Sequence, residues 1–262
     1  MDSRDDTYHF NPQKLQGHAL VITNFTTDPK WKGGAERDHR NMTKAFKRLG
    51  FQVDCHKDVT KSDLKKLLEQ YSKTDLNMSN CFAFAISSHG HEVEEIKNGN
   101  IVKRHALKMV DGSRFYTEDI LAYFKNETCS ALEDKPKIFL IQACRIPISK
   151  STDAHKRVGI GFDQGSDPPN LALPSPAQPS LVQPNSAQPN PVKTNPVVNP
   201  QGTKSQIYYP PAPVEITLVP CHNDMLIMFG CPEGHYAFGN SEDGCDMFRL
   251  FSELVGAWYT KS

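Results

Sequence analysis

The sequence lacks several features that would each define a class of protein. Its 30 basic and 30 acidic residues give a formal net charge of zero, so it has no basic excess to attract nucleic acid or an anionic membrane. No apolar run approaches a membrane span, and the polar start MDSRDDTYHF is unlike a signal peptide. We therefore expect a cytoplasmic protein without nucleic-acid or membrane partners.

Cysteines with the spacing of a metal site or a disulfide framework are also missing. No CxxC pair occurs, and the cysteines are scattered and odd in number. The seven are Cys55, Cys81, Cys129, Cys144, Cys221, Cys231 and Cys245. We expect no metal and no other cofactor, and the usage fits a reducing compartment.

What the sequence does contain is a regular alternation of strand and helix signals. Hydrophobic residues make up 38% of 262 positions, enough for one sizeable core. Strands are predicted at 18–25, 51–56, 81–89, 137–144, 215–219 and 224–229. Helices are predicted at 36–49, after a capping box at Thr60 and Asp63, at 117–125 and at 243–258, with a hairpin at 93–103. This order predicts an α/β fold with a mostly parallel sheet flanked by helices.

Composition divides the chain into four regions. Residues 1–16 form a short polar arm, and residues 17–167 and 214–262 carry the strand and helix signals. Between them, 168–213 begins with a stretch that holds ten of the nineteen prolines, in which Gln-Pro recurs. Such a stretch cannot bury enough apolar surface to form a core, so we expect an extended, disordered linker.

Two apolar runs end in residues that carry chemistry. The first leads into Ser88-His89-Gly90 and the second into Gln142-Ala143-Cys144-Arg145. If the two strands are parallel neighbours, His89 and Cys144 meet at the carboxyl edge of the sheet, where reacting groups collect. An imidazole can then activate the thiol as a nucleophile. The alternatives are a buried structural cysteine and a structural histidine.

Gln142-Ala143-Cys144-Arg145, with a histidine about 50 residues upstream, resembles the signature of the caspase family. Further segments are similar to the same family, in the same order along the chain. They are Asn24-Phe25, the helix 38–49, Ser88-His89-Gly90, Lys135-Pro136-Lys137 and Pro232–Gly244. The resemblance covers about 17–258 apart from the linker.

The resemblance implies a role for each group in the site. Cys144 would be the nucleophile and His89 the general acid/base. The backbone N–H groups of Cys144 and Gly90 would form an oxyanion hole. Gln142 would line the pocket for the substrate side chain.

The resemblance also implies a caspase-like fold with a shortened carboxyl-terminal part. Regions 17–167 and 214–262 would be large and small subunits behind a short pro-arm. The zymogen would be processed after Asp163 or Asp167, and the enzyme would act on proteins in an apoptosis-like pathway.

The specificity pocket departs from the family pattern. Caspases hold a substrate aspartate with two arginines and a glutamine. Lys32 stands where the first arginine is expected, and Gly239 replaces the second in Tyr236-Ala237-Phe238-Gly239-Asn240. Tyr236 and Phe238 are expected to line the groove. We therefore predict a weakened or altered preference for aspartate.

Two further departures concern the loop after Cys144 and the end of the chain. Ile146 replaces a glycine, which predicts a rebuilt loop if that glycine is needed for its backbone geometry. The shortened end lacks the family's last strand, which would leave an open sheet edge and argues against a homo- or heterodimer.

Two hypotheses follow. The first is a caspase-type cysteine endopeptidase with altered specificity. The second is a catalytically deficient homologue that binds and regulates an active caspase, so that its partners would include another caspase or an inhibitor protein.

Overall fold

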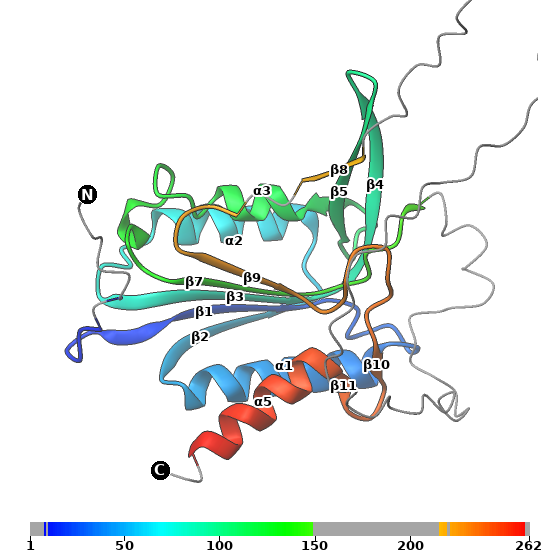
Figure 1. Cartoon of the computed structure of the whole chain (residues 1–262). Coiled ribbons are helices and arrows are strands. Elements are labelled where there is room, and N and C mark those ends of the chain that lie inside the picture. Colours follow the sequence, from blue (N-terminus) through cyan, green and yellow to red (C-terminus); the bar gives the residue numbers. More distant parts are fainter. Residues whose placement is uncertain (1–7, 9, 149–214, 219–220, 260–262) are drawn as a thin grey trace, which may run out of the picture. The chain divides into compact units, whose positions relative to one another are not determined.

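The centre of the molecule is a parallel sheet of five strands. The computed structural model describes residues 8, 10–148, 215–218 and 221–259. The strand order is β2-β1-β3-β7-β9, and every neighbouring pair is parallel (Figure 1). The bounds are β1 Leu15–Thr23, β2 Phe51–Lys57, β3 Ser79–Ser87, β7 Lys137–Gln142 and β9 Met225–Phe229. The predicted α/β fold class is confirmed, and so is the parallel pairing of β3 with β7.

Helices cover both faces of this sheet (Figure 1). One face carries α1 (Lys32–Arg48) and α5 (Asp246–Tyr259), and the other carries α2 (Lys61–Lys73) and α3 (Thr117–Ala122). The predicted capping box of Thr60 and Asp63 begins α2.

Alternate residues along each strand supply the two cores. In β3, Phe82 and Phe84 pack on the side of α2 and α3, whereas Ala83 and Ala85 pack on the side of α1 and α5. All four are fully buried, so the apolar run of this strand is explained by helices on both faces.

A second sheet extends from the carboxyl end of β3. It contains β4 (His89–Lys97), β5 (Asn100–Lys108), β6 (Arg114–Tyr116) and β8 (Glu215–Leu218), which pairs with β5 in parallel. The predicted hairpin turn is confirmed, because Asn98 and Gly99 have φ values of 53° and 78°. The remaining elements are a short 3-10 helix (Ser130–Leu132), β10 (Gly239–Asn240) and β11 (Gly244–Cys245).

The strand predicted at 81–89 has different bounds. β3 ends at Ser87, and His89 is the first residue of β4. The chain turns between them because the Ser88 N–H donates to the Gln142 carbonyl at 3.0 Å, while the Ser88 hydroxyl donates to the Lys108 carbonyl at 2.6 Å.

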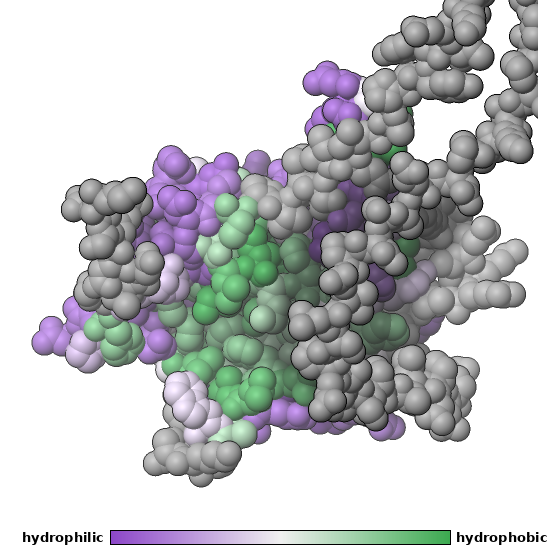
Figure 2. Space-filling view, viewed as in Figure 1, coloured by the Kyte–Doolittle hydropathy of each residue, from purple (hydrophilic) through white to green (hydrophobic). Residues whose placement is uncertain are grey.

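Among the strands that the structure describes, β9 lies at one edge of the five-stranded sheet. Leu226 and Met228 on this strand are 55% and 45% exposed. Apolar side chains gather on this face of the molecule, over β9 and α5 (Figure 2). The exposed apolar residues of α5 are Leu250, Leu254 and Trp258.

Several predictions fall partly or wholly outside the described residues. They are the linker 168–213, half of the arm 1–16 and the processing residues Asp163 and Asp167.

Candidate active site

The parallel pairing of β3 and β7 brings the two predicted catalytic residues into one cleft. The register joins Ser87 to Gln142, so the chain leaves both strands at the same edge. His89 and Cys144 line the cleft together, although they are 55 positions apart in the sequence. This is the placement that the sequence predicted.

Burial favours the neutral form of both groups. Burial raises the pKa of the Cys144 thiol, although a backbone hydrogen bond with Ala237 opposes the shift. Burial, reinforced by the charge of Lys108, lowers the pKa of His89 to about 4. The resting pair is therefore a thiol beside a neutral imidazole.

Aromatic rings hold the His89 imidazole. Its centroid lies 4.2 Å from the ring of Phe25 and 5.2 Å from that of Trp31, which meets it edge-on. Trp31 directly precedes α1, so the start of this helix shapes the wall beside the imidazole.

Gly90 allows the backbone of β4 to approach the nucleophile loop. A Cβ at this position would lie 2.7 Å from both the Ala143 Cβ and the Cys144 carbonyl oxygen. It would also lie 3.0 Å from the His105 Nε2. No larger residue fits without a shift, which explains the glycine in Ser88-His89-Gly90. The predicted oxyanion role of the Gly90 and Cys144 N–H groups stays a prediction.

His105 is a site residue that sequence reasoning missed. It is 2% exposed, and its Nδ1 and Nε2 lie 2.7 Å from the Thr117 hydroxyl and 3.2 Å from the Cys144 carbonyl oxygen. Burial lowers its pKa to about 3, so a neutral ring supports the nucleophile loop. It lies two positions beyond the predicted hairpin 93–103, and the sequence gave no signal of this contact.

A buried ion pair stabilises the loop that carries Cys144. The Arg145 Nε donates to the Glu92 Oε1 at 2.8 Å, with side chains 8% and 0% exposed. The guanidinium also lies over the ring of Phe229, with its Cζ 4.2 Å from the ring centroid. Of the two charged partners, sequence reasoning singled out only Arg145, as part of the signature.

Ile146 fits the loop with ordinary backbone angles. It has no positive φ, it is 8% exposed, and its carbonyl accepts the Glu92 N–H at 2.9 Å. The β-branched residue is therefore accommodated as a buried apolar side chain next to Arg145.

The predicted substrate-binding residues do not all reach the cleft. Gln142, Phe238 and Gly239 line it, and the Gln142 Nε2 donates to the Phe238 carbonyl at 3.3 Å. Tyr236 instead packs beside the buried cluster of Cys144, Cys231 and Ala237. Lys32 is the exposed first residue of α1 and is not one of the described residues that line the cleft.

Backbone occupies the space that a side chain at position 239 would need. Gly239 pairs with Cys245 across β10 and β11. A Cβ there would lie 2.9 Å from the Cys245 Cα and 3.0 Å from the Gly244 carbonyl oxygen. Placing an arginine at this position would therefore require the two short strands to separate.

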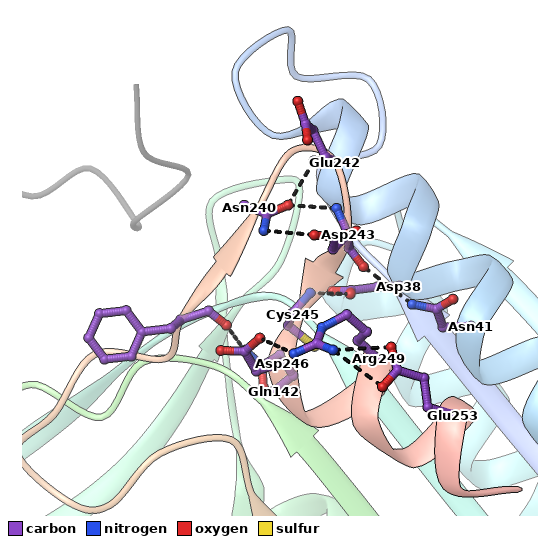
Figure 3. A network of polar contacts seen from close by, with 11 residues as sticks. Asp38, Asn41, Gln142, Asn240, Glu242, Asp243, Cys245, Asp246, Arg249 and Glu253 are labelled. Carbon is purple, nitrogen blue, oxygen red and sulfur yellow. Dashed lines mark hydrogen bonds and ion pairs between the residues drawn. The ribbon is translucent and has the colours of Figure 1, made fainter. Parts of the chain in front are cut away.

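Asp38 is the second cleft residue to which sequence reasoning gave no role. This α1 residue is 2% exposed, and its two oxygens accept the Ser87 hydroxyl at 2.6 Å and the Cys245 N–H at 2.7 Å. Figure 3 shows the second bond, within the polar contacts that join α1 to β11 and α5. Burial raises the pKa of Asp38 against these two hydrogen bonds, which lower it.

The described part of the chain shows no cluster of three or more His, Cys, Asp or Glu side chains that could hold a metal ion. None of its helices is both long and apolar enough to cross a membrane.

Known proteins similar to this chain are caspases. Mouse caspase-8 is 29% identical over 143 residues, which is 50% of this chain and 27% of that protein. Caspase-1 of Drosophila melanogaster is 32% identical over 50% of this chain and 38% of its own length. Mouse caspase-6 is 32% identical over 50% of this chain and 45% of its own length. These matches span less than half the length of each relative.

The fold is similar to that of a solved caspase. The crystal structure of caspase-1 from Spodoptera frugiperda matches with a TM-score of 0.58 at 19% identity, over 98% of this chain and 75% of that chain. A family model described as the caspase domain matches residues 16–258. The chain belongs to the caspase family.

Proposed function

We propose that this chain is a cysteine endopeptidase that cleaves protein substrates with a preference other than that for aspartate. The observation that carries the proposal is the convergence of His89 and Cys144 in one cleft at the ends of β3 and β7. In the reaction, the Cys144 sulfur attacks a peptide carbonyl while its proton passes to the His89 imidazole. The imidazolium then protonates the departing amine, and water, deprotonated by His89, releases the second product from the thioester.

Burial sets the conditions for this chemistry. The raised pKa of Cys144 and the lowered pKa of His89 both disfavour a thiolate–imidazolium pair before substrate binds. Proton transfer would therefore accompany attack. The N–H groups of Gly90 and Cys144 would stabilise the oxyanion, where one donor is typically worth about a hundred- to a thousandfold in rate.

A second candidate is a homologue that binds and regulates an active caspase without turnover. It is favoured by burial, which raises the pKa of Cys144 and lowers that of His89 and so disfavours the thiolate–imidazolium pair. On either candidate, protein partners in an apoptosis-like pathway and a cytoplasmic location remain proposals, as does zymogen processing at Asp163 or Asp167. Fragment masses of purified protein, compared with those of an Asp163→Ala/Asp167→Ala variant, would test the processing.

A labelling experiment separates the two candidates. Cys221 is exposed and would react with any electrophile, so the test uses a Cys221→Ser background. A peptidyl electrophile should label Cys144, and Cys144→Ala should abolish both labelling and turnover of a peptide library. Turnover that survives Cys144→Ala would overturn the protease proposal. Failure to label, beside an active caspase that labels, would favour the regulator.

A further inference from the structure

The substrate cleft contains a buried carboxylate that no cation balances. Asp38 is 2% exposed and lines the same cleft as Cys144 and His89. No ion pair involves Asp38 in the part of the chain that the structure describes; its partners are the Ser87 hydroxyl and the N–H and thiol of Cys245. Buried carboxylates are normally paired with a cation, because neutral donors offset only part of the desolvation cost.

The described residues around Asp38 provide no cation that would balance its charge. The described residues that line the cleft include neither lysine nor arginine. Lys32, which the resemblance suggested as a pocket cation, is exposed at the start of α1. At position 239 the approach of the Cys245 backbone excludes any side chain.

Asp38 has room for a further partner. An ionised carboxylate offers about four acceptor sites, and the hydrogen bonds from the Ser87 hydroxyl and from the N–H and thiol of Cys245 leave about one of them unused. The cleft encloses a cavity of about 50 Å³. One water needs roughly 10–15 Å³ on this measure, so a side chain of about four or five non-hydrogen atoms can enter.

We propose that the cleft selects a lysine side chain at the residue whose carbonyl Cys144 attacks, and that Asp38 is the specificity-determining partner. The position of this residue relative to the cleaved bond rests on the proposed endopeptidase function. The lysine ammonium would donate a charge-assisted hydrogen bond to Asp38. A substrate aspartate would bring a second negative charge to the same cavity and would be rejected.

The first test measures binding, so that it does not depend on turnover. Peptides that differ only in the key residue (lysine, norleucine or aspartate) are titrated against the full chain carrying Cys144→Ala, with fluorescence anisotropy as the readout. Norleucine has the length of lysine without the charge. We expect lysine to bind roughly ten- to a hundredfold more tightly than norleucine, and aspartate to bind most weakly. Aspartate binding as tightly as lysine would overturn the proposal.

The second test removes the charge of Asp38 and keeps its shape. In Asp38→Asn the amide oxygen can still accept the Cys245 N–H, and the amide nitrogen can donate to the Ser87 hydroxyl. The advantage of lysine over norleucine should fall to near unity, while the thermal midpoint stays close to that of the parent. The matched control is Asp119→Asn, which removes an exposed carboxylate outside the cleft and should keep the lysine preference.

The two tests distinguish this inference from the proposed function. Selective lysine binding by a chain that never cleaves peptides would support the role of Asp38 and reject the protease. Cleavage after uncharged residues alone would support the proposed function and reject the role of Asp38.

Discussion

The two sides of the cleft treat buried charge differently. On the nucleophile side, Arg145 and Glu92 form an ion pair at 2.8 Å, and both side chains are buried. On the substrate side, Asp38 is as deeply buried but meets only neutral donors, which are a hydroxyl, a backbone N–H and a thiol. The Arg145–Glu92 pair balances its own charges and holds the loop that carries Cys144. The charge of Asp38 has no such partner and could be balanced by a bound cationic group.

The largest loss of stability should come from breaking the ion pair between Arg145 and Glu92. Arg145→Met keeps much of the side-chain volume but leaves Glu92 buried and unpaired, which should lower the free energy of unfolding by about 3–5 kcal/mol. Chemical denaturation measures this loss. Arg249→Met is the control, because it removes a partly exposed ion-paired arginine on α5 and should change stability little. Equal losses in both variants would mean that burial does not distinguish the two pairs.

A smaller effect should follow from a methyl group beside the nucleophile. In Gly90→Ala the new Cβ would meet Ala143 and the Cys144 carbonyl at 2.7 Å, so the variant should lose about 1–3 kcal/mol and label poorly at Cys144. In the control Gly256→Ala on α5, the nearest atom is the flexible tip of Arg48, which can move away. Normal labelling of Gly90→Ala would show that the loop tolerates a shift.

Substituting Gly239, on the substrate side of the cleft, should lower stability by a smaller amount and should not create a new binding specificity. Gly239→Arg should lose about 1–2 kcal/mol, because its Cβ meets the Cys245 backbone, and it should not create tight binding of an aspartyl peptide. Gly239→Ala should lose a similar amount, since the Cβ alone causes the contact. Thermal melting and peptide anisotropy measure the two outcomes. An aspartate preference gained by Gly239→Arg would show that β10 and β11 separate easily.

Stability should also depend on pH. Burial lowers the pKa of His105 to about 3, so between about pH 6.5 and 3 the unfolded chain binds a proton that the folded chain excludes. This group therefore reduces stability as the pH falls through that window, by at most about 1.4 kcal/mol per pH unit. The raised pKa values of Asp38 and Glu92 act in the opposite direction.

His105→Gln isolates the contribution of this histidine. Glutamine can bond to Thr117 and to the Cys144 carbonyl without titrating, so stability should fall less steeply with acid than in the parent. The check is a series of denaturation curves from pH 7 to pH 4. Parallel profiles for the two proteins would exclude His105 as a source of the slope.

Local patterns in the sequence were sufficient for the fold class and for the position of the pair. The apolar runs of β3 and β7 predicted buried parallel strands, and the residues after them predicted which groups share an edge. These inferences rest on the period of side chains along a strand and on the few ways in which parallel strands can be connected. For the same reason, the hairpin turn at Asn98-Gly99 and the capping box of α2 were readable from neighbouring residues.

Local sequence patterns could not predict which side chains line and support the cleft. Asp38 looked like an ordinary helix residue until the fold placed β11, more than 200 positions away, against it. His105 gave no sign of contact with Cys144, and Lys32 was placed in the pocket by its order in the sequence alone. The sequence by itself determined which segments form helices and strands and which reactive residues follow β3 and β7. These features depend on the local periodicity of side chains and on how parallel strands are connected. The balance of charge in the cleft was decided by the tertiary structure, since burial and long-range contacts exist only after the chain has folded.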